Sequence, residues 1–558
     1  MRDADEARED EETLADGAGE SPDGKETMES RTTKSSFLLS GLVLISRITG
    51  FMRTWVQALA IGVTPLASCY TVANNLPSQL YELVVGGMLV TAFLPVYMSV
   101  KKERGSEAAS KYASNLTGIV GVGMLAVTVL SVIFAAQVVW TQSFSATEGF
   151  DFDRATWFFR FFAIEMVLYS LSSIFSGVLN AERDYLWSGA APIANNMVAI
   201  GSFVAYMLLV GRNPSAALLA LALGNPLGVL AQVLLQMPAL KARGVRIRPV
   251  VDLRDPYLRD TLSIGVPSVV VMVCSFVTVS VQTSSALYAT ASGASVAAYA
   301  RLWYTLPYAI FIVPITTTLF TELSDRFSAD DRKGWRDGVS YGMGRILLIS
   351  VPLAMLLAVF AFRLVALIGP DFSPEDSAMT AHYLRALAVS LPLYGICMYL
   401  QKVCSSVRRM KTYAVANVVA AVVQIAICLA LTPVFGLQVV AYSSFAYFAS
   451  VDVVTLAVLR KTEGRLGLGA ALSTGARGLA CGLAGAVVGM VIQTIAFGGV
   501  DVAPQSMLTV VIQCLASGIP ALVACAVPLV LMASKAGVSL PGPLARLSVR
   551  SERPREQG

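Results

Sequence analysis

Apolar residues fill most of this chain in runs of about 20, and shorter polar stretches separate these runs. A helix of about 20 apolar residues spans the roughly 30 Å hydrocarbon core of a bilayer. We therefore predict an all-α polytopic membrane protein with about 14 transmembrane helices. The expected spans lie near residues 36–62, 70–99, 112–140, 156–180, 187–211, 215–239, 260–290, 294–322, 339–369, 378–406, 411–434, 437–459, 471–497 and 506–534.

The composition supports this class of protein. Of the 558 residues, 55% are apolar and 14% are charged, whereas an average soluble domain carries about 25% charged residues. The eight cysteines show no CxxC spacing and His382 is the only histidine, so we expect neither a disulfide framework nor a metal site. The sequence also lacks a Walker-type phosphate loop, a hydrolase nucleophile elbow and a zinc-protease motif. These absences favour a transporter over an enzyme, without a cofactor and without a nucleic-acid partner.

The charges in the loops predict the orientation. Lys and Arg concentrate in the cytoplasmic loops of membrane proteins. With a cytoplasmic N-terminus, the basic stretches 101–104, 241–259, 326–336 and 408–411 all fall inside, and the acidic stretches 148–153 and 371–376 fall outside. If one helix had been missed, every later loop would be assigned to the wrong side of the membrane. The observed alternation of basic and acidic loops therefore supports an even number of spans. We therefore place the protein in the cytoplasmic membrane with both termini in the cytoplasm.

A weak internal repeat predicts the domain organisation. Leu76-Pro77 is matched by Leu306-Pro307, and Ala194-Asn195 by Ala416-Asn417. Two parallel six-helix lobes with a site at their interface are a transporter plan. The expected units are a disordered acidic N-terminus (1–35), an N-terminal lobe (36–240), a C-terminal lobe (241–460), a lipid-facing helix pair (461–534) and a basic cytoplasmic tail (535–558).

Two arginines, Arg47 and Arg53, lie inside the first apolar segment. An ionised side chain in hydrocarbon costs at least about 2.5–3.5 kcal/mol, so such residues usually face a polar cavity. Their spacing places the two residues about 9 Å apart along one helix. We interpret the pair as a binding site for an anion such as a phosphate. The alternative is that one or both lie near the cytoplasmic end and extend to lipid headgroups.

The second span is irregular. Asn74 and Asn75 precede Pro77, Gly86-Gly87 follows, and Glu82 lies between these breaks. Broken helices are tolerated in a membrane where neighbours or cavity water satisfy the freed backbone groups. The span is either a cavity wall, with Glu82 pairing an arginine or carrying a proton, or a kink that serves packing.

Further polar residues lie in the later spans. Arg301, in the eighth span, is a third candidate for the anion site because no acidic residue lies near it in sequence. Asp452 lies deep in the twelfth span and has no assigned role. Ion pairing or contact with headgroups is expected for most of the charged residues nearer span ends, which are Arg160, Glu165, Arg345, Arg363 and Arg385. The glycines of the thirteenth span, Gly478, Gly482, Gly485 and Gly489, predict close helix packing.

Two motifs resemble those of a known family. The segment Ser46–Arg53 resembles the first-helix motif of the MurJ/MviN lipid II flippases, and the segment from Leu76-Pro77 to Phe93-Leu94-Pro95 resembles their second-helix signature. The resemblance extends over most of residues 36–460. It implies the fold of the MOP exporter superfamily, with two six-helix lobes in a V and two C-terminal helices beside a lipid-facing groove.

The resemblance also implies a substrate-binding role for Arg47, Arg53 and, approximately, Arg301. This sequence departs from the family where Thr54 and Ser68 replace acidic residues and where Glu82 stands in place of a basic one. Such departures bear on the substrate and the coupling ion more than on the fold.

The expected function is export of lipid II, the undecaprenyl-pyrophosphate-linked peptidoglycan precursor, by alternating access. Arg47, Arg53 and Arg301 would bind the diphosphate, with Glu82, Asn74 and Asn75 in the same cavity, while the isoprenoid tail stays among membrane lipids. An ion gradient or the membrane potential would supply the energy. The alternatives are a flippase for another polyprenyl-linked oligosaccharide, a superfamily exporter of a different substrate, or a scaffold for cell-wall enzymes.

Overall fold

The computed structural model describes residues 28–86, 93–248, 250–502 and 506–535. The basic tail beyond residue 535, the first 27 residues, and Gly87 of the second-span motif lie outside them. The described helices are α2 (Met28–Ile61), α3 (Pro65–Tyr81), η1 (Glu82–Gly86), α4 (Leu94–Ile133), α5 (Ala135–Trp140), α6 (Phe152–Phe162), α7 (Glu165–Ala181), α8 (Tyr185–Leu209), α9 (Pro214–Ala242), α10 (Pro256–Ala289), α11 (Gly293–Pro307), η3 (Tyr308–Ile312), α12 (Val313–Ser328), α13 (Arg332–Ile368), α14 (Pro374–Ala388), α15 (Leu391–Ser406), α16 (Met410–Phe435), α17 (Leu437–Glu463), α18 (Leu468–Phe497) and α19 (Met507–Lys535).

The predicted all-α membrane architecture is confirmed. Within the described residues, 11 helical stretches are long and apolar enough to cross a membrane, or 12 if α14 and α15, bent by 48°, form one span. The predicted spans 36–62 and 70–99 correspond to α2 and to α3 with η1, which that count does not include. The total of about 14 spans therefore stays a prediction.

Two helix boundaries differ from the sequence prediction. The helix α2 begins at Met28, so residues 28–35, predicted to be disordered, are helical; no Gly or Pro interrupts this stretch. Between the predicted second and third spans, α4 consists of two helices that meet at a kink, where Gly105 takes a non-helical conformation with φ of +83°. A positive φ carries little steric penalty at glycine, so the predicted break is present but is shorter than the loop that we expected.

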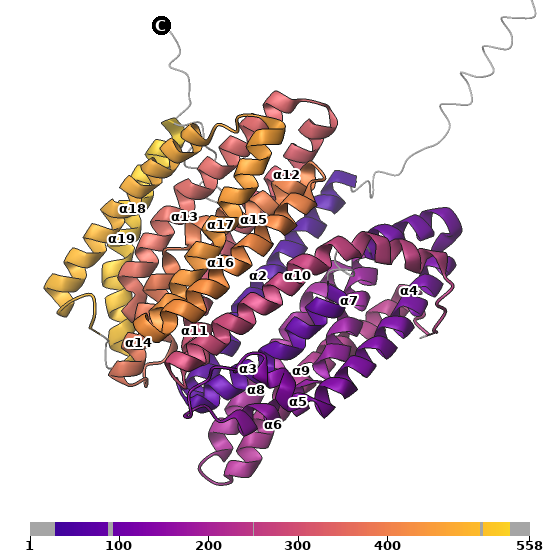
Figure 1. Ribbon diagram of the computed structural model, residues 1–558, viewed down its shortest axis with the longest axis horizontal. Coiled ribbons are helices and arrows are strands. Elements are labelled where there is room, and N and C mark those ends of the chain that lie inside the picture. The colour runs from indigo at the N-terminus through magenta and orange to yellow at the C-terminus, as the bar shows by residue number, and fades with distance from the viewer. Residues whose placement is uncertain (1–27, 87–92, 249, 503–505, 536–558) are drawn as a thin grey trace, which may run out of the picture.

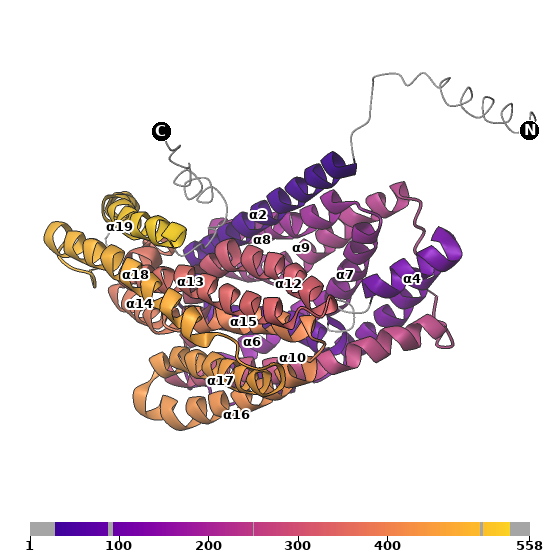
Figure 2. The same ribbon diagram turned by 90° about the horizontal axis from the view of Figure 1, so that it is seen from above.

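The helices form two groups, which we call the N-terminal group (α2–α9) and the C-terminal group (α11–α17). One hydrophobic core draws its buried residues from Ile61 to Ala294, and another from Ile312 to Ala471. The helix α10 passes between the groups and packs against α16 at its C-terminal part (Figure 1). Figure 2 shows α18 and α19 on the outer flank of the C-terminal group, away from α4 and α7.

Both groups contain the same kind of helix break. Pro77 lies inside α3, which continues as the π-helix η1, and Pro307 ends α11, which continues as the π-helix η3. A proline removes one backbone donor, and π-helical turns are frequent at functional sites. The Leu-Pro repeat in the sequence therefore corresponds to a repeated feature of the structure.

The glycines of α18 pack closely, as predicted from their spacing. A Cβ atom at Gly478 would lie 3.0 Å from the carbonyl oxygen of Leu348 on α13. At Gly485 it would lie 2.7 Å from the carbonyl oxygen of Ala521 on α19. A side chain at Gly485 would require its neighbour to shift, and one at Gly478 would be tightly packed, so the glycines allow α18 to lie close to α13 and α19.

Arg363 lies deeper than the sequence indicated. Its side chain is 0% exposed, and it donates hydrogen bonds to Oε1 of Gln493 at 2.6 Å and to the carbonyl oxygen of Gly499 at 3.1 Å. It therefore anchors the end of α18 instead of extending to headgroups. Arg385 forms the expected ion pair, with Asp501 at 2.5 Å. Together they fix the turn after α18 to the C-terminal group.

The close approach at Gly485 makes a stability prediction. We expect Gly485→Ala to lower the melting temperature of the detergent-solubilised protein because the new methyl group meets a backbone atom; overpacking of this kind costs about 1–3 kcal/mol. The control is Gly123→Ala, which lies within α4 with no atom within 4 Å of the new Cβ. Equal melting temperatures for the two variants would contradict the close packing of α18 and α19.

Candidate functional site

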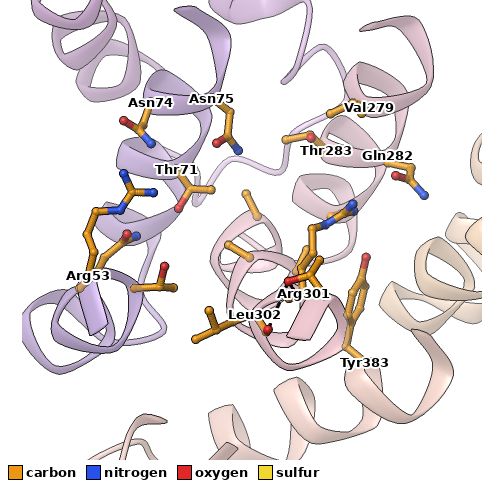
Figure 3. A pocket seen from close by; sticks show the side chains of 17 residues that line it. Arg53, Thr71, Asn74, Asn75, Val279, Gln282, Thr283, Arg301, Leu302 and Tyr383 are labelled. Atoms are coloured by element: carbon orange, nitrogen blue, oxygen red, sulfur yellow. Dashed lines mark hydrogen bonds between the residues drawn. The ribbon is translucent and has the colours of Figure 1, made fainter. Parts of the chain in front are cut away.

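A polar cavity of about 350 Å³ lies between the two groups of helices. Its walls come from α2, α3, α10 and α11, with one residue from α14. Figure 3 shows side chains from the two groups facing each other across it. The lining residues are Arg53, Thr54, Gln57, Thr71, Asn74, Asn75, Val279, Gln282, Thr283, Ala286, Ala294, Ala297, Ala298, Arg301, Leu302, Thr305 and Tyr383.

The charge in this cavity is purely positive. Arg53 projects from α2 and Arg301 from α11, and the lining contains no Asp or Glu. Neither guanidinium forms a hydrogen bond or an ion pair with any other residue in the described part of the chain. Two fixed charges from opposite walls therefore face one cavity. This arrangement suits a multiply charged anion that reaches both arginines.

Neutral polar groups surround these charges. Thr71, Asn74 and Asn75 lie on the α3 side, and Gln282 and Thr283 lie on the α10 side (Figure 3). The Asn74 Oδ1 accepts a hydrogen bond from Nδ2 of Asn225 on α9, which leaves its amide donors available. Amides and hydroxyls of this kind can bond the hydroxyl and amide groups of a sugar.

The cavity unites four of the six predicted site residues, which are Arg53, Asn74, Asn75 and Arg301. Arg47 lies outside the lining and is exposed on α2. Glu82 is exposed at the start of η1 and also lies outside the lining. The roles proposed for these two residues stay predictions.

Sequence reasoning missed the environment of Glu165. This residue begins α7 and is 0% exposed, although its position near a span end indicated headgroup contact or an ion pair. The carboxyl group lies in the N-terminal core beside the hydroxyl of Tyr169, and the positive charge that acts on it is that of Arg53 on α2. No pattern in the sequence pairs Arg53 with a residue more than 100 positions away, so only the fold reveals this neighbour.

The two groups of helices meet at one end of the cavity, where α2 turns into α3 and α10 turns into α11. The backbone N–H of Ser295 donates to Oγ of Ser68 at 3.1 Å, and the Tyr299 hydroxyl donates to the Gly62 carbonyl oxygen at 3.0 Å. Ser145 bonds Ser284 beside them, with 2.8 Å between the two hydroxyl oxygens. We call these bonds the intergroup contact. They hold the groups together at the end predicted to face outward.

The family model for the lipid II flippase MurJ matches residues 57–509. The chain belongs to the MurJ family. Arg47 and Arg53 precede the matched segment, whereas Asn74, Asn75, Glu82 and Arg301 lie within it.

Two individual members of the family are similar in sequence to this chain. A probable lipid II flippase MurJ of Borreliella burgdorferi is 24% identical over 431 residues, which cover 76% of this chain and 83% of that protein. The lipid II flippase MurJ of Burkholderia cenocepacia is 25% identical over 363 residues, or 64% of this chain and 69% of that protein.

Solved structures of two kinds share the fold. A lipid II flippase MurJ in an inward closed conformation superimposes with a TM-score of 0.69 at 18% identity, covering 88% of this chain and 98% of that one. An inward-facing multidrug resistance MATE transporter of the MOP superfamily matches with a TM-score of 0.60 at 15% identity, covering 78% and 95%. This chain therefore has the same fold as these two transporters.

The intergroup contact predicts a cross-link. In the variant Ser68→Cys/Ser295→Cys, we expect oxidation to join the two groups of helices by a disulfide, because the hydroxyl oxygens of the native serines lie 3.4 Å apart. Mass spectrometry of the digested protein would identify the linked peptides, with Ser68→Cys alone as the control. Absence of the linked peptide under oxidising conditions would contradict the contact.

Proposed function

We propose that this protein is a flippase that carries lipid II, a polyprenyl-diphosphate-linked peptidoglycan precursor, across the cytoplasmic membrane. The proposal is supported by membership of the MurJ family and by an intergroup cavity that contains Arg53 and Arg301 and no acidic lining residue. The arginine-lined cavity is the deciding observation, because it indicates which kind of ligand the protein can bind.

Charge complementarity selects the diphosphate. A diphosphate diester carries two permanent negative charges, which the two guanidinium groups of the cavity match. Two opposite charges 4 Å apart attract by about 4 kcal/mol at the effective dielectric near a protein surface, against about 1 kcal/mol in bulk water. Arg also binds phosphate oxygens in a bidentate manner, which orients the group as well as holding it.

The glycan and the isoprenoid tail of the substrate would each lie in surroundings of suitable polarity. The amide and hydroxyl side chains around the arginines offer hydrogen bonds to the glycan. The isoprenoid tail, which has no place in a polar cavity, would stay in lipid along α18 and α19, whose outer residues such as Leu483 and Leu522 are exposed and apolar. The substrate would thus extend from the cavity into the bilayer.

Transport would proceed by alternating access. The intergroup contact closes one end of the cavity, so opening that end requires Ser68 and Tyr299 to lose their partners while the other end closes. Because the predicted orientation places the contact outside, the cavity would load from the cytoplasm. The substrate is anionic, so an inside-negative membrane potential favours its outward movement.

Loss of either cavity arginine should weaken binding of lipid II. A hydrogen bond to a charged group contributes about 1.5–3 kcal/mol, so we expect Arg53→Ala and Arg301→Ala each to weaken affinity roughly 10- to 150-fold. We also expect neither variant to rescue a cell that lacks its own lipid II flippase at normal expression. Binding would be measured with purified lipid II and the protein in nanodiscs.

The matched control for this experiment is Arg160→Ala. Arg160 is exposed on α6 and lies outside the cavity, so its loss should leave affinity and rescue unchanged. Full affinity in both Arg53→Ala and Arg301→Ala would contradict the proposed function.

A further inference from the structure

A second basic pocket, of about 480 Å³, lies in the C-terminal group and shares no lining residue with the intergroup cavity. It forms where the ends of α12, α15 and α17 meet the beginnings of α13 and α16, at the face that the loop charges predict to be cytoplasmic. Its lining residues are Phe327, Arg332, Trp335, Arg336, Val407, Arg409, Thr462 and Glu463. Three arginines and one glutamate give the lining an excess of positive charge.

The carboxylate of Glu463 holds two of these arginines in place. Its side chain is only 8% exposed, and its two oxygens contact different partners. Oε2 accepts a hydrogen bond from Nη1 of Arg332 at 3.3 Å, and Oε1 lies 3.0 Å from Nε of Arg409. The third guanidinium, that of Arg336, donates instead to the carbonyl oxygens of Arg332 and Glu463, at 3.2 and 3.3 Å. One carboxylate therefore organises three guanidinium groups and can neutralise only one of them.

The surrounding structure supports this arrangement. Gly464 has φ of +92°, and Nη1 of Arg336 lies 2.7 Å from the position that a Cβ atom would take there, so a side chain would displace this guanidinium. Trp335 is buried, and its Nε1–H donates to Oγ of Ser406 at 3.2 Å, which ties α13 to the end of α15. Packed and hydrogen-bonded neighbours thus define the pocket.

The three guanidinium groups retain donors for a ligand. Each has five N–H groups. Within the described part of the chain, the contacts above and the hydrogen bond from Arg332 to Asp330 occupy no more than two on each arginine. The side chains of Arg332 and Arg409 are 47% and 44% exposed, so a ligand from outside can reach them. Free guanidinium donors on neighbouring arginines match the oxygens of a phosphate group.

The corresponding ion pair in the N-terminal group has the opposite polarity. There Asp184 precedes α8 and pairs at 2.9 Å with Arg243 at the end of α9. In the C-terminal group the base, Arg409, precedes α16, and the acid, Glu463, ends α17. Helix dipoles favour an acid at the N-terminus and a base at the C-terminus, so they stabilise the first pair and oppose the second.

An ion pair alone therefore does not account for the polarity of the C-terminal group. The reversed pair concentrates positive charge beside the N-terminus of α16, where no side chain caps the backbone N–H groups. A bound anion would be stabilised by both the arginines and this helix N-terminus, and it would offset the unfavourable placement of Arg409.

We propose that this pocket, which we call the arginine pocket, binds a phosphate group through Arg332, Arg336 and Arg409. The phosphate belongs either to the headgroup of an anionic phospholipid or to a soluble phosphate compound, since both present the same oxygens; basic pockets between helices at the cytoplasmic surface bind such headgroups. A bound phosphate connects the beginnings of α13 and α16 and so stabilises the C-terminal group. The inference does not rest on the proposed function, because the arginine pocket lies outside the transport cavity.

The experiment measures the melting temperature of the full-length protein in nanodiscs of phosphatidylcholine alone, with phosphatidylglycerol added, or with inorganic phosphate in the buffer. A ligand that binds only the folded protein raises this temperature. For the wild-type protein we expect an increase with phosphatidylglycerol if the source is a headgroup, and with inorganic phosphate if the source is soluble. In Arg336→Gln and Arg409→Gln we expect most of the increase to disappear, because loss of one charged donor weakens binding about tenfold or more.

The matched control is Arg460→Gln. Arg460 is exposed near the same end of α17 and lies outside the lining, so this variant should keep the full increase. Each variant is compared with itself with and without the phosphate source, so a change in its basal stability does not affect the result. If Arg409→Gln does not fold, Arg409→Lys, which can still pair with Glu463, replaces it and should keep only part of the increase.

Absence of an increase with both phosphate sources in the wild-type protein would overturn the inference. So would an increase in Arg336→Gln and Arg409→Gln as large as that in Arg460→Gln, since the phosphate would then act elsewhere. Failure here is distinguishable from failure of the proposed function, because Arg53→Ala and Arg301→Ala change the transport cavity and leave the arginine pocket intact.

Discussion

Fixed positive charge in a polar cavity between two groups of helices is the constraint on which this structure depends. Arg53 and Arg301 cannot lose their protons under physiological conditions, and the lining supplies no acidic group to balance them. Each charge is therefore tolerable only while water or an anion occupies the cavity. The faces of α2, α3, α10 and α11 that line this cavity carry polar side chains. Their other faces pack in apolar cores.

The helix breaks serve the same cavity. The π-helical turns after Pro77 and Pro307 occupy corresponding places in the two groups, so each group has a weak point in a helix that borders the site. The intergroup contact, by contrast, consists of a few hydrogen bonds that involve hydroxyl groups, beside an apolar cluster in which Ala58 and Val63 pack with Val296. Hydrogen bonds of this kind contribute about 1 kcal/mol each.

The sequence predicted the helical membrane fold, and it drew attention to Arg53 and Arg301 as candidate site residues, because both inferences use local signals. Apolar run length identifies spans, and an arginine such as Arg53 is conspicuous in an apolar segment. It could not place Arg363, whose partners Gln493 and Gly499 lie more than 100 residues away. Nor could it reveal that Glu165 is fully buried in the N-terminal group, because helix packing and not sequence spacing creates that environment.

The most direct test of the central claim is an experimental structure of the protein in nanodiscs with lipid II bound. The account predicts density for the diphosphate in the cavity between α2 and α11, with phosphate oxygens within hydrogen-bonding distance, about 3 Å, of the guanidinium groups of both Arg53 and Arg301. A diphosphate held elsewhere, with both arginines directed toward lipid headgroups, would contradict it.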